Sequence, residues 1–306
     1  MKRRHFIKQT ATTVGAFSLP FIGSNILAKT YSSVSGHTTG QTAGYKKAIM
    51  WGTIGKGVVA DKCKIIKAAG FAGIEASSHM DRKEVLDAVK AHGLEISSVC
   101  STSPGGRPLS NPDAAMRQQA VESIIHALED AKAYGTDAVL VYPGLVSDSI
   151  SYDECWRLSV EGVKKTIPTA EKLQVNICIE NVWNNFLLSP MEAANYVDQF
   201  NSPYVKFYFD CGNVCNYGWP EQWIRILGNR IGRIHIKEFD KKAADKQGRS
   251  QGFNVKLTEG DINWTKVMAE IRNNYKSDWL VSEQSTTATL EDMTDLCDRF
   301  DKLLRM

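Results

Sequence analysis

Eight short apolar runs, separated by stretches of helical periodicity, constrain the fold of this chain more than any other feature. Each run is about four to seven residues long and is bounded by Gly, Asn, Asp or Pro, as expected of buried parallel strands. Eight strand-plus-helix units with no break in composition predict a single (β/α)8 TIM barrel over residues 46–306. The runs span residues 48–51, 72–76, 94–100, 138–142, 175–180, 205–210, 233–237 and 279–283.

Capping residues mark the ends of several helices between these runs. Ser189 and Pro190 supply an N-cap and a first-turn proline, and Gly93 and Gly135 lie where helices are expected to end. An open doubly wound sheet is the competing architecture, but no Gly-rich phosphate turn follows any run. The helices expected from caps and periodicity span residues 81–92, 114–134, 263–273 and 290–304.

Residues 1–28 have the features of an export signal. They begin with basic residues and continue through an uncharged stretch that contains too many polar residues for a membrane span. The pair Arg3–Arg4 resembles a twin-arginine signal specifically, so we expect a periplasmic protein. Residues 29–45 are rich in Ser, Thr and Gly and are expected to form a flexible leader.

Removal of the signal changes the charge balance of the chain. It takes away four of the 37 basic residues and none of the 34 acidic ones, so the net charge falls from +3 to −1. We therefore expect no nucleic-acid partner and no stable membrane association of the mature chain.

The seven cysteines predict neither disulfides nor a cysteine-bound metal. Their number is odd, and Cys100, Cys178 and Cys211 lie in or beside apolar runs, where cysteine is a small buried apolar residue. Cys211 and Cys215 have a spacing seen in metal pairs, but the sequence has no second pair.

The last four apolar runs each end in a side chain that can bind a metal. Active sites of (β/α)8 barrels lie at the C-terminal ends of the strands, so these side chains are expected at one rim. Three carboxylates there would repel one another and be costly to bury without a cation. With one imidazole they favour one divalent ion, Mn²⁺ first and Co²⁺, Mg²⁺, Zn²⁺ or Fe²⁺ as alternatives. The expected metal ligands are Glu180, Asp210, His235 and Glu283.

The segments around these positions resemble the sugar phosphate isomerase/epimerase (xylose isomerase-like) superfamily. The resemblance covers residues 46–304. It implies that the four residues hold the metal, that Glu180 and Glu283 also act as acid and base, that a small sugar is the substrate, and that a homodimer is the assembly. The segments that carry it are I-E-N at 179–181, D-C-G-N at 210–213, I-H-I-K at 234–237, T-E-G-D-I-N-W at 258–264 and S-E-Q at 282–284.

The chemistry of such a site agrees with this resemblance. A metal chelated by adjacent carbonyl and hydroxyl oxygens acidifies the C–H between them and stabilises an enediolate. Carboxylates on opposite sides of the sugar can then move a proton between faces or to the next carbon. The predicted reaction is epimerisation or aldose–ketose isomerisation, and export favours a non-phosphorylated sugar such as a 3-keto-glycoside.

One departure from the family concerns the substrate. Free-ketose 3-epimerases carry a His three residues after the strand-six Asp and an Arg shortly after the strand-seven His, whereas this chain has Asn213 and no such Arg. Lys237 is a candidate for the substrate-oxygen contact and a catalytic role, and a salt-bridged rim lysine is the alternative interpretation. The polar loop 241–256 is a candidate lid in which Arg249 could contact an anion. The residues expected to contact substrate are Trp51, Glu75, His79, Trp183, Asn184 and Asn213.

Two other functions remain as alternatives, and a third is rejected. The same metal site could serve a lyase or hydrolase of 3-keto-glycosides, which would release the aglycone. A non-catalytic periplasmic sugar-binding protein on the same barrel is the second alternative. A metal-dependent endonuclease is rejected because it needs extra histidines and a basic face, and the mature chain has five histidines and almost no net charge.

Overall fold

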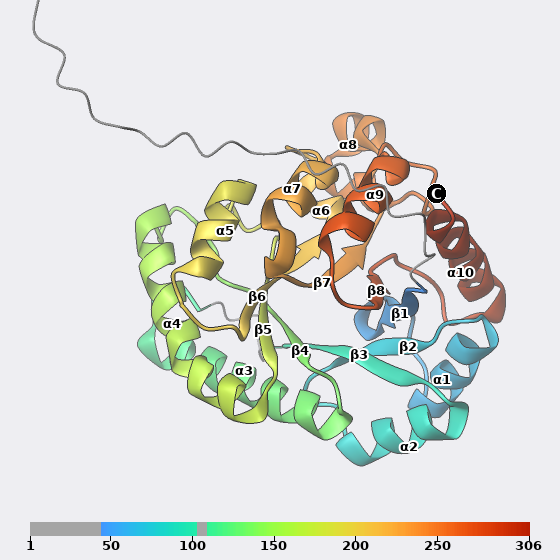
Figure 1. The fold of residues 1–306 in the computed structure, drawn as a ribbon, viewed down its shortest axis with the longest axis horizontal. Coiled ribbons are helices and arrows are strands. Elements are labelled where there is room, and N and C mark those ends of the chain that lie inside the picture. The colour runs from blue at the N-terminus through green and yellow to red at the C-terminus, as the bar shows by residue number, and fades with distance from the viewer. Residues whose placement is uncertain (1–43, 103–108) are drawn as a thin grey trace, which may run out of the picture. The chain divides into compact units, whose positions relative to one another are not determined.

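Eight parallel strands close into one barrel, in sequence order, with helices around the outside (Figure 1). The computed structural model describes residues 44–102 and 109–306; the predicted signal and most of the predicted leader lie outside this range. The predicted single (β/α)8 barrel is confirmed. The strands are β1 (Lys46–Met50), β2 (Gly73–Ser77), β3 (Glu95–Cys100), β4 (Ala138–Val141), β5 (Asn176–Glu180), β6 (Val205–Asp210), β7 (Ile231–Ile236) and β8 (Trp279–Ser282).

The helices follow the strands, and the predicted ones agree with the structure to within one residue at each end. Within the described ranges, three 3₁₀ helices lie between them: η1 (Trp51–Thr53), η2 (Gly228–Arg230) and η3 (Arg249–Phe253). The α-helices are α1 (Val59–Ala68), α2 (Arg82–His92), α3 (Ala114–Tyr134), α4 (Tyr152–Leu173), α5 (Pro190–Asp198), α6 (Cys211–Val214), α7 (Pro220–Leu227), α8 (Lys241–Gln247), α9 (Trp264–Asn274) and α10 (Leu290–Leu304).

The predicted caps form as expected. The Ser189 hydroxyl accepts a hydrogen bond from the backbone N–H of Glu192 at the start of α5. Gly93 and Gly135 end α2 and α3 with φ values of 60° and 76°, a left-handed conformation that favours glycine.

Alternation along each strand separates an outer core from the barrel interior. On β6, Phe207 and Phe209 pack on Trp223 of α7, with ring centroids 6.5 and 6.1 Å apart. Tyr208 and Asp210 therefore lie on the opposite face, inside the barrel. Burial of each phenylalanine contributes about 1.5–3 kcal/mol, so this register is strongly fixed.

The segment 241–256 is folded, which corrects the prediction of a polar loop. It contains α8 and η3, and the Asp240 carboxylate caps α8 by accepting from the Ala243 N–H at 2.9 Å. Helical periodicity is absent from this segment because Ala244 is the one residue of α8 that is buried, which leaves no apolar stripe.

All seven cysteines are free and buried, including Cys100, Cys178 and Cys211, for which burial was predicted. Cys215 Sγ contacts the Cys211 backbone oxygen at 3.2 Å, so this pair is engaged with the backbone. Among the described residues, the helices are too short or too polar to cross a membrane.

Candidate metal centre

Four consecutive strands bring four metal-binding side chains together at one rim of the barrel. Glu180 ends β5, Asp210 ends β6, His235 lies near the end of β7 and Glu283 follows β8. Each offers a ligand atom, and these atoms all lie within 4.8 Å of one another. The arrangement follows from the parallel barrel, because the ends of its strands meet at the same rim.

His235 directs its Nδ1 atom toward the three carboxylates. Nδ1 lies 3.0 Å from Glu283 Oε2, 3.2 Å from Glu180 Oε1 and 3.8 Å from Asp210 Oδ2. The imidazole is fully buried, so its contacts with these groups are not diluted by water. Nδ1 is therefore the nitrogen that faces the candidate metal position.

Asp210 is held by backbone and side-chain hydrogen bonds that leave one oxygen directed into the centre. Its Oδ1 accepts from the Asn213 N–H at 2.5 Å and caps α6. The Asn181 amide brackets the Asp210 backbone, accepting from its N–H at 2.8 Å and donating to its C=O at 2.9 Å. Asp210 Oδ2 is the remaining oxygen.

The electrostatics of the centre favour a bound cation. Burial raises the pKa of Asp210 well above its usual value and also raises the pKa of Glu180. Burial opposes protonation of His235, but the carboxylates of Glu75 and Glu283 outweigh it and raise the His235 pKa well above its usual value. Without a metal, the group of carboxylates therefore retains protons that a divalent ion would displace.

Two unsatisfied oxygens test whether the residues fit a metal. Asp210 Oδ2 and Glu283 Oε2 are buried and accept no hydrogen bond from the described part of the chain. Buried carboxylate oxygens without a partner are costly, and a cation bound between them would remove that cost. The three carboxylates and one imidazole thus fit a divalent ion.

Lys237 is the other charged group in the centre. Its Nζ lies 2.9 Å from Glu283 Oε1, 3.3 Å from Asn213 Oδ1 and 3.8 Å from Asp210 Oδ2. Burial opposes the charge of Lys237, but Asp210 and Glu283 outweigh it and raise the lysine pKa. His235 and Lys237 in turn overcome the effect of burial on Glu283 and lower the pKa of that carboxyl.

The residues predicted to contact substrate fall into different environments. Asn184 is fully buried and bonded to backbone, with its amide donating to the Gly144 C=O at 2.7 Å. His79 is exposed and stacks on His126, with ring centroids 4.3 Å apart. Trp51 lies in η1, where Lys62 Nζ is 3.7 Å from its ring centroid.

Glu75 is fully buried behind the His235 ring, on the side away from Asp210 and Glu283. Its two oxygens contact His235, Ser98 and Tyr208. Its contact with a substrate stays a prediction.

Trp183 belongs to an aromatic wall at the rim, built with the segment after β7. Its ring lies 4.8 Å from the Phe253 ring, and Lys237 Nζ lies 4.4 Å from the Phe253 centroid. The Arg249 guanidinium lies 4.8 Å from the centroid of the Trp183 ring. It also donates to Asn216 Oδ1 when the Asn216 amide is oriented with its oxygen toward the arginine. We refer to Trp183, Arg249 and Phe253 as the rim wall.

Sequence reasoning missed two residues that fix the loops around the centre. The Glu238 carboxylate is fully buried and accepts from the Thr258 N–H at 2.9 Å and from Trp264 Nε1 at 2.6 Å. Gln284, next to Glu283, accepts from the Glu238 N–H at 3.1 Å and donates to the Val255 C=O at 2.6 Å. Glu238 follows Lys237 directly, and a charged residue just beyond a buried strand was the available signal.

Comparison with known proteins places the chain in a family. A family model described as xylose isomerase-like TIM barrel matches residues 63–302. The chain belongs to the xylose isomerase-like TIM barrel family. The resemblance inferred from the strand-end motifs is therefore confirmed at the level of the superfamily.

Relatives of this xylose isomerase-like protein include sugar epimerases. The L-ribulose-5-phosphate 3-epimerase UlaE of Escherichia coli O1:K1 is 24% identical over 264 residues, 79% of this chain and 89% of that protein. The apo structure of the 3-keto-D-glucoside 4-epimerase YcjR from E. coli is similar with a TM-score of 0.72 and 14% identity, covering 86% of this chain and 100% of that one. A structure of an L-ribulose 3-epimerase has a TM-score of 0.71 and 15% identity, covering 85% and 95%.

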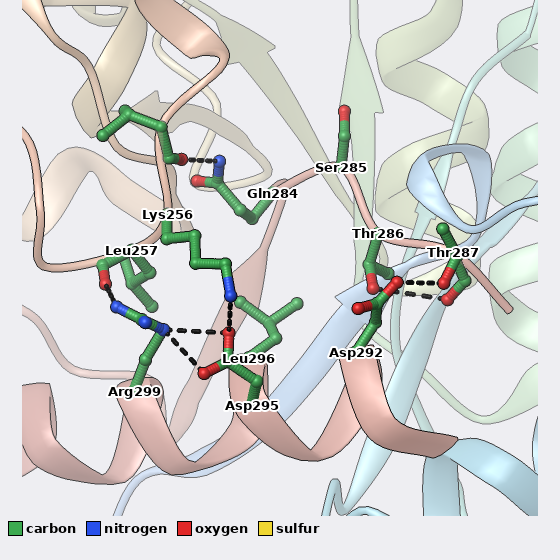
Figure 2. A pocket seen from close by; sticks show the side chains of 11 residues that line it. Lys256, Leu257, Gln284, Ser285, Thr286, Thr287, Asp292, Asp295, Leu296 and Arg299 are labelled. Carbon is green, nitrogen blue, oxygen red and sulfur yellow. Dashed lines mark hydrogen bonds and ion pairs between the residues drawn. The ribbon is translucent and has the colours of Figure 1, made fainter. Parts of the chain in front are cut away.

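A separate hollow of about 430 Å³ lies between α10 and the segments after β7 and β8 (Figure 2). Lys256 and Arg299 line it, and both form ion pairs with Asp295. Gln284 also lines the hollow, and its amide donates to the Val255 C=O. Asp292, the fourth charged residue of the hollow, accepts a hydrogen bond from the Thr287 hydroxyl. The charged groups of the hollow thus have partners among the residues that line it, and the chemistry is expected at the metal centre.

Proposed function

We propose that this protein is a divalent-metal-dependent sugar epimerase or isomerase. The observation that carries the proposal is the convergence of ligand atoms of Glu180, Asp210, His235 and Glu283 within 4.8 Å, with two buried carboxylate oxygens that accept no hydrogen bond from the described residues. The epimerase activities named for its relatives support the same reaction class. Mn²⁺ is the ion we favour, because three carboxylates and one imidazole suit a borderline-to-hard cation.

The two glutamates divide the proton transfers. A divalent ion held by the four ligands supplies Lewis acidity to adjacent carbonyl and hydroxyl oxygens of the sugar. Glu283 is the candidate base, because His235 and Lys237 lower its pKa and so hold it in the ionised form that can accept a proton. Glu180, whose Oε1 lies 3.2 Å from His235 Nδ1, is the candidate for the second proton transfer, as the family resemblance implies.

Lys237 orients the base and contributes positive charge. Its ammonium donates to Glu283 Oε1 at 2.9 Å and is fixed by Asn213 on its other side. In this position it can also donate to a substrate oxygen on which negative charge develops. Lys237 and Asn213 thus take the place of the Arg and His that the free-ketose 3-epimerases carry.

The substrate we propose is a non-phosphorylated sugar, with a 3-keto sugar as the first choice. This follows from the predicted twin-arginine signal over residues 1–28, which would place the mature protein in the periplasm. The rim wall supports a sugar ligand, because aromatic faces pack against the C–H faces of sugar rings. A homodimer is the assembly we propose on family resemblance.

Deuterium incorporation from D₂O tests the reaction. The mature protein with Mn²⁺ would be incubated with free ketoses, aldoses and 3-keto-glycosides, with and without chelator. We expect chelator-sensitive deuterium at a sugar carbon together with a new isomer. Asp210→Asn should abolish the exchange, and Glu122→Gln, on the exposed face of α3, should leave it intact.

Other outcomes would replace the proposal by an alternative. Release of the aglycone from 3-keto-glycosides would identify a lyase or hydrolase at the same centre. Metal-dependent sugar binding without deuterium exchange or cleavage would identify a binding protein.

A further inference from the structure

We propose that Glu75 is a positioning residue that fixes His235 with Nδ1 toward the metal. The inference rests on the proposed metal centre and deepens it by adding a residue that touches neither the metal nor the sugar. It assigns to Glu75 a function other than the substrate contact predicted from its place at the end of β2.

The two ring nitrogens of His235 face different partners. Nδ1 points to the three carboxylates of the centre, whereas Nε2 lies 3.1 Å from Glu75 Oε1. A neutral imidazole carries a hydrogen on one nitrogen and a lone pair on the other. A hydrogen bond from Nε2–H to Glu75 therefore leaves the lone pair on Nδ1, where the metal is expected.

Glu75 is itself held as a pure acceptor. Its Oε2 accepts from the Ser98 hydroxyl at 2.7 Å and from the Tyr208 hydroxyl at 2.5 Å. Both hydroxyl groups act as donors to this oxygen, so the other oxygen is left to accept from His235. The carboxylate cannot rotate toward the substrate side without breaking these bonds.

The supporting residues come from strands on different sides of the barrel. Glu75 lies on β2, Ser98 on β3 and Tyr208 on β6, and His235 is on β7. The Tyr208 and His235 rings also pack together, with centroids 4.4 Å apart. All four side chains are fully buried, so barrel closure fixes the imidazole orientation before metal binds.

This arrangement has a chemical consequence for metal affinity. A carboxylate that accepts from the distal N–H of a ligating histidine fixes the tautomer and raises the basicity of the ligating nitrogen. Loss of such a partner lowers metal affinity about 10- to 100-fold in other proteins. A structural ion pair alone would instead change stability and leave the metal affinity of the folded protein unchanged.

Calorimetric titration with Mn²⁺ tests the effect of Glu75 on metal affinity. Glu75→Gln keeps the size of the side chain but removes the charge and one acceptor oxygen, and we expect Mn²⁺ to bind about 10- to 100-fold more weakly. Tyr208→Phe, which removes one donor to Glu75, should give a smaller loss in the same direction. Glu95→Gln, an exposed glutamate at the start of β3, is the matched control and should bind as the wild type does. Circular dichroism would establish that each variant is folded.

Nitrogen NMR of the wild-type protein tests the tautomer without any substitution at Glu75. In ¹⁵N-histidine-labelled protein loaded with Zn²⁺, His235 should carry its hydrogen on Nε2 and the metal on Nδ1, with the signal assigned by its loss in His235→Gln. Metal on Nε2, or wild-type affinity in folded Glu75→Gln, would overturn the proposal.

The outcome is separable from that of the proposed function. Wild-type protein that binds Mn²⁺ with the expected tautomer but exchanges no deuterium would leave Glu75 as a positioning residue and remove the reaction. Wild-type protein that binds no divalent ion would overturn both.

Discussion

Lys237 Nζ lies 2.9 Å from Glu283 Oε1, so a fixed positive charge stands beside a carboxylate that is also a candidate metal ligand. The roles of Glu283 as metal ligand and as base place opposite demands on Lys237. The ammonium that orients the carboxylate for proton transfer also repels an incoming cation. We therefore expect Lys237→Gln to lower kcat about 100-fold, as loss of one oxyanion donor commonly does. Mn²⁺ affinity should be unchanged or tighter.

Steady-state kinetics and Mn²⁺ titration of the same preparation separate these effects. Lys206→Gln is a suitable control, because Lys206 lies near the start of β6, away from the strand ends that carry the metal centre. Among the described residues, Lys206 Nζ hydrogen-bonds only to the Asn229 backbone oxygen. Weaker metal binding in Lys237→Gln would show that the lysine supports the ligands and has no direct part in the reaction.

Asp210→Asn should remove the metal without unfolding the protein. The asparagine oxygen can still cap α6 through the Asn213 N–H, whereas an NH₂ group replaces the unsatisfied Oδ2. We expect Mn²⁺ affinity to fall more than about 100-fold, because a donor group would point at the cation. The metal-free Tm should be equal to or above that of the wild type, because an amide cannot ionise and so avoids the cost of burying a carboxylate oxygen without a partner. A large drop in the metal-free Tm would contradict this account.

The fold and the four strand-end residues could be predicted from the sequence because both depend on local patterns. Short apolar runs predict strands, and residues that end parallel strands must meet at one rim. Glu180, Asp210, His235 and Glu283 are found in this way without knowledge of any side-chain contact.

The partners of these residues could not be predicted in the same way. The contact between Glu75 and His235 joins β2 to β7, and it depends on which side chains point inward once the barrel has closed. The structure of 241–256 was missed for another reason. Its short helix is stabilised by the Asp240 cap and carries no apolar stripe, so a period-based analysis assigns it to a loop.

The stabilisation by Mn²⁺ should grow as the pH rises from mildly acidic to mildly alkaline. The pKa values of Glu180, Asp210 and His235 are raised in the folded, metal-free protein, so folding favours their protonated forms. That contribution is lost as pH rises, and the same deprotonation frees the ligands for the metal. Glu283 contributes to stability with the opposite sign, because its pKa is lowered in the folded protein. Its contribution is lost only in more acidic solution, where the carboxylate is protonated.

Thermal denaturation with and without Mn²⁺ across this range measures the effect. The Tm of the metal-free protein should fall or stay level as pH rises, while the gain from Mn²⁺ increases. A gain from Mn²⁺ that is independent of pH would show that these groups do not release protons on metal binding.

Glu238→Ala should destabilise the protein by about 2–6 kcal/mol. The substitution leaves the Thr258 N–H and the Trp264 indole N–H without their acceptor, and each buried donor without a partner costs about 1–3 kcal/mol. Glu259→Ala is the contrast, since Glu259 forms an exposed ion pair with Arg299 worth about 0–1 kcal/mol. Urea denaturation of both variants gives the comparison, and equal losses would count against the assigned role of Glu238.

Arg249→Ala tests the charge of the substrate. The guanidinium is exposed and lies over Trp183 in the rim wall, where it could pair with an anionic group of a ligand. Since we propose a non-phosphorylated sugar, we expect kcat/KM for that substrate to change by less than about threefold, because a neutral sugar loses at most one exposed contact. Lys246→Ala, on the exposed face of α8, removes the same charge away from the wall and serves as the control. The opposite result has two parts: the wild type turns over a phosphorylated ketose faster than its neutral counterpart, and Arg249→Ala alone loses tenfold or more of kcat/KM for that phosphorylated ketose. This result would reverse the substrate assignment and make Arg249 the residue that recognises the phosphate.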